Sequence, residues 1–325
     1  YGLDIDDRAG QLSVLAILLK AREKDKNIFN KEIVRNLNIM SIQESDSINE
    51  FVISNLTDKD SQNNVLYLID VFTNAKEIGS LVQLEKKDYT DLKEKIMEDD
   101  TIFGLELKEK ILPLIKQAEI LTNMYDLVVT NPPYMNKGAM PDNLKKLVFK
   151  NYANYKTDLF SAFVIRNIKL SKKDGLLGFM TPYVWMFISS YEEFRQDLLS
   201  LVGIDSLIQL EYSSFEEAVV PICSFVIRNT EENIQGNYIK LSDYKGGMKI
   251  QEEKFIEIKN KKQKDFFITD SKNISKIPGM PISYWLSEEM YATFLNKKIS
   301  DFTLPKAGVV TGNDSFFVKY WTEVD

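Results

Sequence analysis

Residues 125–134 read YDLVVTNPPY, and this stretch decides the fold of the chain. Its first six residues include four apolar-leaning ones in a row and have the pattern of a strand. Neither Pro132 nor Pro133 has a backbone N–H to donate to a sheet ladder, so the strand must end at Asn131. An ordinary turn would place Gly, Asp or Asn beside a single proline. The sequence therefore predicts a strand whose end presents an amide, two rigid rings and the aromatic ring of Tyr134.

Strand patterns alternate with amphipathic helix patterns on both sides of this stretch. The strand patterns lie at residues 1–5, 37–45, 175–182, 204–212 and 221–229, and the helix patterns at residues 6–25, 61–79, 88–98, 105–122, 142–152, 158–171 and 191–202. This alternation predicts an α/β fold with a doubly wound, mostly parallel sheet. In such sheets ligands bind beyond the carboxyl ends of the strands, which is where Asn131 is expected.

The composition limits the chemistry that the chain can perform. It has no histidine, which excludes His-dependent triads and imidazole metal sites. Its single cysteine, Cys223, cannot form a thiolate cluster and is expected to be a small buried apolar residue, so no metal site is predicted. No apolar run reaches the roughly 18–20 residues of a membrane span, and no signal peptide opens the chain. We expect a soluble, cytoplasmic protein without a membrane partner.

Charge and composition also divide the chain. The net charge of −7 does not indicate a nucleic-acid binder, although segregated charge would still permit one. Residues 240–276 are locally basic, and they are interpreted either as a solvated loop or as a phosphate-contacting segment. We predict a catalytic domain over residues 1–230 with a helical insertion at about 46–122. Residues 231–325 are predicted to be a lysine-rich linker and, from about residue 277, the start of a further domain.

Asn-Pro-Pro-Tyr can activate a planar exocyclic amine. The lone pair of such an amine is delocalised into its ring, so the nitrogen is a poor nucleophile. Two acceptors facing its two hydrogens would draw the nitrogen toward a tetrahedral, more nucleophilic geometry. The side-chain oxygen of Asn131 can be one acceptor and the carbonyl of Pro132 the other. Tyr134 offers a stacking face worth about 1–3 kcal/mol per base, and the chemistry needs no histidine.

Asn131-Pro132-Pro133-Tyr134 after an apolar strand resembles the catalytic motif of S-adenosylmethionine-dependent adenine-N6 methyltransferases. The rest of the chain is similar to large bacterial adenine methylases of the BREX phage-defence type and to type IIG restriction–modification enzymes. The blocks that carry this similarity are FTNAKEIGSLVQL (72–84), IPGMPISYWLS (277–287) and GVVTGNDSFFVKYWTEV (308–324). The resemblance implies a Rossmann-like class I methyltransferase fold, S-adenosyl-L-methionine as cofactor and double-stranded DNA as substrate. Its implied partners are defence-system or restriction subunits, and the last two blocks would lead into a target-recognition domain.

The resemblance assigns cofactor-binding residues to the ends of three strands. Asp4 would accept hydrogen bonds from the ribose hydroxyls, and Glu44 would receive the adenine amine of the cofactor. Asn131 would contribute to the same site beside its catalytic role.

The resemblance also assigns residues to the target base. Tyr134 and Phe215 would stack on opposite faces of a flipped adenine, and Asp158 would lie near its pocket. The residues alone leave open that Asp158 is only a helix N-cap and that Phe215 is only a core aromatic.

The chain departs from this family in one respect, because the Gly-rich turn that cradles the methionine part of the cofactor has no match. In the order of the family it would lie upstream of Tyr1, together with a central strand. We therefore expect an irregular gap in the sheet or a partner strand that fills it, since sheets normally protect their edges. We also expect this chain alone to bind the cofactor weakly or not at all, and to be inactive by itself.

Two alternative functions remain compatible with the sequence. The same tetrapeptide occurs in release-factor glutamine methyltransferases and in RNA amino methyltransferases, which are compact and lack the 46–122 insertion. The chain would otherwise be a non-catalytic, methylase-like fragment that binds DNA or partner proteins.

Overall fold

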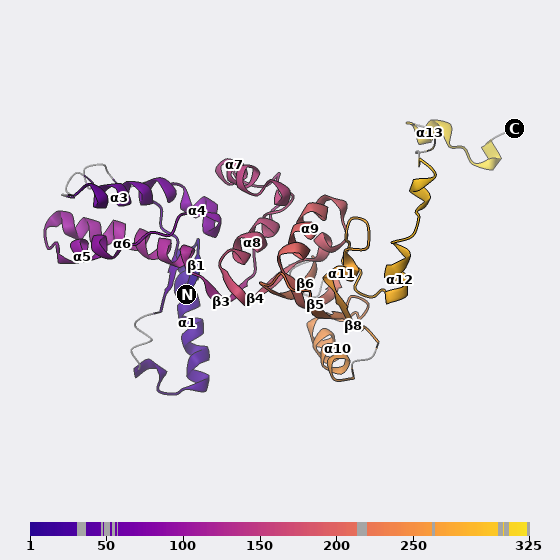
Figure 1. Ribbon diagram of the computed structural model, residues 1–325, viewed down its shortest axis with the longest axis horizontal. Helices are drawn as coiled ribbons and strands as arrows, with labels where there is room; N and C mark the ends of the chain where they lie inside the picture. Colours follow the sequence, from indigo (N-terminus) through magenta and orange to yellow (C-terminus); the bar gives the residue numbers. More distant parts are fainter. Residues whose placement is uncertain are drawn as a thin grey trace.

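Figure 1 shows the computed structural model of the chain. The residues that it describes are 1–30, 37–46, 48, 53, 56, 58–212, 220–261, 264–304, 308 and 312–323.

Among these residues the strands form two sheets. The smaller sheet pairs β1 (Gly2–Asp4) in parallel with β2 (Ile39–Ser41). The larger sheet has the order β3-β4-β6-β5-β7-β8, and its strands are β3 (Tyr125–Thr130), β4 (Ser171–Pro182), β5 (Gly203–Tyr212), β6 (Pro221–Arg228), β7 (Gln235–Lys240) and β8 (Phe266–Asp270). The pairings make β3, β4, β5 and β7 run in one direction, with β6 and β8 opposed to them. The predicted doubly wound, mostly parallel α/β fold is confirmed.

Helices connect the strands and cover the sheet. They are α1 (Asp7–Lys24), α3 (Lys59–Val71), α4 (Ala75–Ile78), α5 (Thr90–Glu98), α6 (Ile102–Thr122), α7 (Asp142–Asn151), α8 (Leu159–Ile168), α9 (Glu192–Leu201), α10 (Gly247–Lys261), α11 (Ser271–Ile274), α12 (Glu288–Thr293) and α13 (Asp314–Phe317). Of these helices, α3 to α6 lie between β2 and β3, where the sequence predicted a helical insertion. They have an apolar core of their own, which Ile42, just after β2, joins. No helix of the described residues is both long and apolar enough to cross a membrane.

A gap separates the two sheets, with β1 on one side of it and β3 on the other. The rings of Tyr1 and Tyr125, at the starts of the two strands, lie 5.3 Å apart. A cavity of about 170 Å³ lies beside them and is lined by residues of both strands. Leu127 and Val129 of β3 are 67% and 81% exposed, so apolar side chains of this edge strand are uncovered. The predicted gap in the sheet is therefore confirmed for the described residues.

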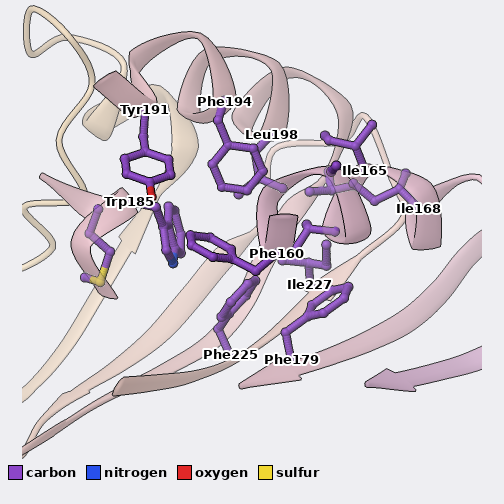
Figure 2. Packing of buried hydrophobic residues seen from close by; sticks show 14 of the residues in the cluster. Phe160, Ile165, Ile168, Phe179, Trp185, Tyr191, Phe194, Leu198, Phe225 and Ile227 are labelled. Carbon is purple, nitrogen blue, oxygen red and sulfur yellow. The ribbon is translucent and has the colours of Figure 1, made fainter. Parts of the chain in front are cut away.

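The main core lies between the six-stranded sheet and helices α8 and α9. Figure 2 shows aromatic rings from both layers meeting there. The indole of Trp185 lies 5.6 Å from the ring of Phe194 in an edge-to-face arrangement and 5.3 Å from the ring of Phe225. Its Nε1 donates to Thr181 Oγ1 at 3.1 Å, which satisfies its polar atom inside the core. Cys223 is fully buried in the same core, as predicted, and burial raises the pKa of its thiol to about 12.

Residues 235–270, which lie within the predicted lysine-rich linker, contain regular secondary structure. They form β7, α10 and β8, and the two strands extend the same sheet as β3 to β6. Tyr238 of β7 is buried and stacks at 4.9 Å on Tyr284, whose hydroxyl donates to Gln209 Oε1 at 2.7 Å. The predicted division near residue 230 thus falls between two strands of one sheet. As a boundary between functional regions it remains a prediction.

Candidate active site

The Asn-Pro-Pro-Tyr segment lies at the carboxyl end of β3 and faces outward. Thr130 of β3 pairs with Phe179 of the parallel strand β4, so the residues that follow both positions meet at one rim of the sheet. The Tyr134 hydroxyl lies 3.0 Å from the carbonyl oxygen of Met180 and 2.9 Å from Asn131 Oδ1. Asn131 is exposed and Tyr134 is 38% exposed. The amide and the aromatic ring are thus held together on the surface of the domain, at the rim where α/β sheets bind ligands.

The Pro132 carbonyl and the Asn131 amide oxygen are the acceptors that the sequence predicted. Pro132 is buried, which fixes the backbone between the two exposed residues. Among the described residues no hydrogen bond is accepted by the Pro132 carbonyl. The amide oxygen of Asn131 has two lone pairs and receives one hydroxyl. Both groups therefore retain capacity to accept from a further donor.

The Tyr134 hydroxyl stays protonated at physiological pH. Burial raises the pKa of this phenol from its ordinary value near 10 to about 12. Its single hydrogen is shared between two acceptors, the Asn131 amide oxygen and the Met180 carbonyl, so the hydroxyl fixes the ring plane and the amide at once.

Replacing Tyr134 separates the contribution of the ring from that of the hydroxyl. Tyr134→Phe keeps the ring but loses both hydrogen bonds, and we expect the methyl transfer that the sequence resemblance implies to slow by up to about tenfold, as for a net loss of 0.5–1.5 kcal/mol. Tyr134→Ala also loses the stacking face and should slow transfer by a further factor of about 10 to 100. Single-turnover rates measured from pH 7 to 10 should show no titration of Tyr134. Equal rates for the two variants would remove the ring from the site.

Asp158 is the N-cap of α8 and also fastens the segment that leaves Tyr134. Its Oδ1 accepts from the backbone N–H of Met135 at 3.0 Å and of Phe160 at 3.3 Å. The backbone of Leu159 donates to the Met135 carbonyl at 2.9 Å, and Asn136 forms a bridge with Asp158. Burial raises the pKa of this carboxyl, and the backbone hydrogen bonds oppose that rise. The structure shows Asp158 as the N-cap of α8. Its role beside a substrate remains a prediction.

Two variants of Asp158 test the capping role. The pKa of Asp158 is raised in the folded state, so the fold favours the protonated carboxyl. The contribution of this group to the free energy of unfolding therefore falls as the pH rises through that pKa. Asp158→Asn keeps an acceptor without the buried charge, and its free energy of unfolding at pH 7 should equal or exceed that of the native chain. Asp158→Ala should lose about 1–2 kcal/mol. Urea unfolding measures both, and equal stability of the two variants would contradict the cap.

The predicted cofactor residues Asp4 and Glu44 lie at the ends of β1 and β2. Asp4 Oδ1 accepts from the backbone N–H of Asp6 at 2.9 Å, and Glu44 Oε1 accepts from that of Lys76 at 3.1 Å. Each of these two bonds occupies one oxygen of its carboxylate. In the described part of the chain, no hydrogen bond joins either residue to Asn131–Tyr134. The structure thus shows two half-exposed carboxylates beside neighbouring strand ends, and their role remains a prediction.

The carboxylate of Asp7 links α1 to Ser41 of β2 and to Lys76 of α4. It lies in the first turn of α1 and binds the hydroxyl of Ser41, and its Oδ2 lies 3.1 Å from Lys76 Nζ. These hydrogen bonds, led by that of Ser41, lower the pKa of Asp7. The N-cap of α1 is Asp6, which accepts from two backbone N–H groups.

One group of the site could not be predicted from the sequence, and one predicted residue has no described position. The Met180 carbonyl anchors Tyr134, but a backbone atom leaves no signal in the residue type. Phe215, predicted to stack on the substrate base, lies outside the described residues. Among the residues that are described, no group of three or more His, Cys, Asp or Glu side chains could hold a metal ion.

A doubly wound α/β domain that presents Asn-Pro-Pro-Tyr at the end of a strand falls in the class of methyltransferase-type domains. More particularly, the chain belongs to the Eco57I restriction-modification methylase family, whose family model matches residues 1–215. This agrees with the resemblance drawn from the motifs.

Two relatives align with the whole chain. The adenine-specific methyltransferase PglX of Lacticaseibacillus casei (strain Zhang) is 30% identical over 340 residues, and the alignment covers 28% of that protein. The adenine-specific methyltransferase BrxX of Escherichia coli O9:H4 (strain HS) is 30% identical over 357 residues, covering 29% of it. The chain thus spans less than a third of the length of these relatives.

Solved structures with a similar arrangement include methyltransferase subunits of type I restriction–modification systems. The subunit from Streptococcus thermophilus has a TM-score of 0.40 and 18% sequence identity, with 53% of this chain and 45% of that chain covered. The modification subunit of a type I restriction enzyme from Vibrio vulnificus YJ016 has a TM-score of 0.37 and 12% identity, with 55% and 47% covered.

Proposed function

We propose that this chain carries the catalytic centre of an S-adenosylmethionine-dependent DNA methyltransferase that modifies the N6 amine of adenine. The observation that carries the proposal is the outward-facing pair of acceptors at the end of β3, the Asn131 amide oxygen and the Pro132 carbonyl, beside the anchored ring of Tyr134. Membership of a restriction-modification methylase family supports it.

The cofactor would be held by the strand ends on the other side of the gap. Asp4 would accept from the ribose hydroxyls and Glu44 from the adenine amine, each with the carboxylate oxygen that is not engaged with backbone. These acceptors suit the nucleoside half of S-adenosylmethionine, whereas the Gly-rich cradle for its methionine half has no counterpart in the sequence. When bound, the cofactor supplies an electrophilic methyl group.

The residues of the chain orient the amine for direct attack. With adenine in place, the Tyr134 hydroxyl would donate to the Met180 carbonyl alone, which frees Asn131 Oδ1 for one hydrogen of N6. The Pro132 carbonyl would take the second hydrogen. Proximity and alignment then provide most of the acceleration. The same two acceptors stabilise the positive charge that develops on N6, to which the Tyr134 ring adds cation–π attraction.

The substrate would be double-stranded DNA, from which the target adenine is flipped at a cost of a few kcal/mol. Phe215 would close the opposite face of the base, and Asp158 would hold the segment that follows Tyr134. A protein that modifies the cell's own DNA would work in the cytoplasm. Its further partners would be other subunits of a phage-defence or restriction system.

Two measurements distinguish this function from its alternatives. Cellular DNA, release factors and RNA from strains with and without the gene are digested and analysed for methylated products by mass spectrometry. We expect N6-methyladenine in DNA only when the gene is present. Methylglutamine in release factors or methylated RNA bases would replace the proposed substrate. Photochemical crosslinking of labelled S-adenosylmethionine to the intact protein tests whether it is a catalyst, and failure to crosslink would favour the non-catalytic alternative.

A further inference from the structure

The segment that follows Tyr134 projects from the rim of the site and returns to it. The backbone of Lys137 donates to the Thr157 carbonyl at 3.3 Å, next to the bridge between Asn136 and Asp158. Residues 135–157 therefore form an excursion whose two ends are fastened together beside Asn-Pro-Pro-Tyr. The two ends of this excursion therefore lie next to the proposed substrate site, and α7 lies between them along the chain.

Helix α7 within the excursion is packed on one side only. Leu144 and Val148 are buried in the main core. The first turn is held by Glu77, whose carboxylate accepts from the backbone N–H of Asn143 at 3.1 Å and of Leu144 at 3.3 Å. Phe149, on the other side, is 42% exposed. The fixed side determines which residues α7 turns to the solvent.

The solvent side is basic. Residues 135–157 contain five lysines and one aspartate, a net charge of +4 in a chain whose total charge is −7. We call these lysines the α7 lysine group, and they are Lys137, Lys145, Lys146, Lys150 and Lys156. All are exposed except Lys145, which is half-buried. Lys156 Nζ lies 5.7 Å from the centroid of the Phe149 ring, so a cation and an aromatic face share this surface.

Asp142, in the first turn of α7, is the one acidic residue of this segment. In the described part of the chain, none of the five lysines takes part in an ion pair. Two neighbouring carboxylates are engaged elsewhere, since Glu77 binds the start of α7 and Asp197 accepts from Tyr155 Oη at 2.7 Å. By contrast, Lys254 and Lys261 of the lysine-rich helix α10 both pair with Glu257, at 2.8 Å each.

We propose that the α7 lysine group binds backbone phosphates of duplex DNA adjacent to the target base. The proposal rests on the proposed function for its choice of substrate. Lysines without an ion-pair partner on a fixed helix suit the negative phosphates, which repeat along a DNA duplex whatever its base sequence. Contacts between these lysines and phosphates would set the register of the DNA relative to Asn131 without reading the sequence of its bases. The basic segment 240–276 is the weaker candidate, because several of its lysines are neutralised within the chain.

The test compares two variants of the intact protein with equal loss of charge. The first carries Lys145→Gln, Lys146→Gln, Lys150→Gln and Lys156→Gln. The control carries Lys249→Gln, Lys254→Gln, Lys259→Gln and Lys261→Gln on α10, which Figure 1 shows at the opposite border of the molecule from α7. Binding to a fluorescein-labelled duplex is followed by anisotropy over a range of salt concentrations. Each lost phosphate contact lowers the magnitude of the slope of log K against log salt by about 0.9.

The expected result is a slope whose magnitude is smaller by up to about 3.6 and at least a tenfold weaker affinity at roughly 100 mM salt for the α7 variant, with little change for the control. Four results would overturn the inference: a native slope for the α7 variant, an equal loss in the control, tighter binding to duplex RNA of the same sequence, or no duplex binding by the native protein. Methyl transfer measured in parallel keeps the two proposals apart. If the α7 variant has the native slope while the native protein transfers methyl groups, only the proposal for the lysine group is refuted. If the α7 variant has an altered slope while the native protein transfers no methyl group, only the proposed function is refuted.

Discussion

Asn131→Ala is expected to abolish methyl transfer by the intact protein while leaving its fold unchanged. The variant removes one of the two acceptors that face the amine and leaves the Pro132 carbonyl alone. Removing one preorganised polar group from a developing charge commonly costs a factor of about 10² to 10³ in rate. The side chain of Asn131 is exposed, and Tyr134 Oη is its hydrogen-bond partner, so no core packing is lost.

The measurement is single-turnover transfer of a radiolabelled methyl group to duplex DNA, with circular dichroism and urea unfolding as checks of the fold. Asn260→Ala on the exposed face of α10 is the matched control and should behave as the native protein. Asn131→Asp retains an acceptor oxygen and should lose less activity than Asn131→Ala. Transfer at a near-native rate by Asn131→Ala would take this residue out of the mechanism.

The strands and the rim of the site were predictable because their signals are local. A run of four apolar-leaning residues, ended by Asn131 and two prolines, predicts both the strand Tyr125–Thr130 and its end. Because parallel strands end at one rim, the position of Asn131 at a binding edge also followed from the sequence. The gap beside β3 followed from a motif that the chain lacks.

What remained hidden depends on contacts between distant residues. Strands β7 and β8 were hidden because Lys, Asn, Gln, Glu and Gly dominate the segment that contains them, and only pairing with β5 gives inward residues of β7, such as Tyr238, a core to enter. The anchoring of Tyr134 by the Met180 carbonyl involves residues 46 positions apart. The net charge of −7 concealed the basic α7 segment, because acids elsewhere in the chain outnumber its lysines.

The burial of Arg195 was equally invisible, because arginine is almost never fully buried unless its charge is paired. This side chain on α9 is 1% exposed. Its Nη1 donates to the carbonyls of Trp185 at 2.8 Å and Ile188 at 2.7 Å, and its Nε and Nη2 both donate to that of Gly279, at 2.9 and 2.6 Å. Burial lowers the pKa of the guanidinium, which nonetheless remains charged. Arg195 thereby connects the segment after β4 with residues beyond β8.

Arg195→Ala is therefore expected to destabilise the chain by at least about 3 kcal/mol, since it leaves buried carbonyls without donors and opens a cavity. For a chain of this size the thermal midpoint should fall by about 6–12 °C. Thermal and urea unfolding measure the change, with Arg8→Ala at an exposed position as the matched control, expected within about 0.5 kcal/mol of native. Arg195→Lys keeps the charge but cannot span carbonyls on two sides, so its loss of stability should be intermediate.

If residues 277–285 were an independent unit merely resting on the sheet, Arg195→Ala would leave the main unfolding transition in place and expose only that segment to proteolysis. A single cooperative transition at lower temperature would instead mean that these residues stabilise the same core as β3 to β8, because the carbonyl of Gly279 and the rings of Tyr284 and Tyr238 then unfold together with the sheet.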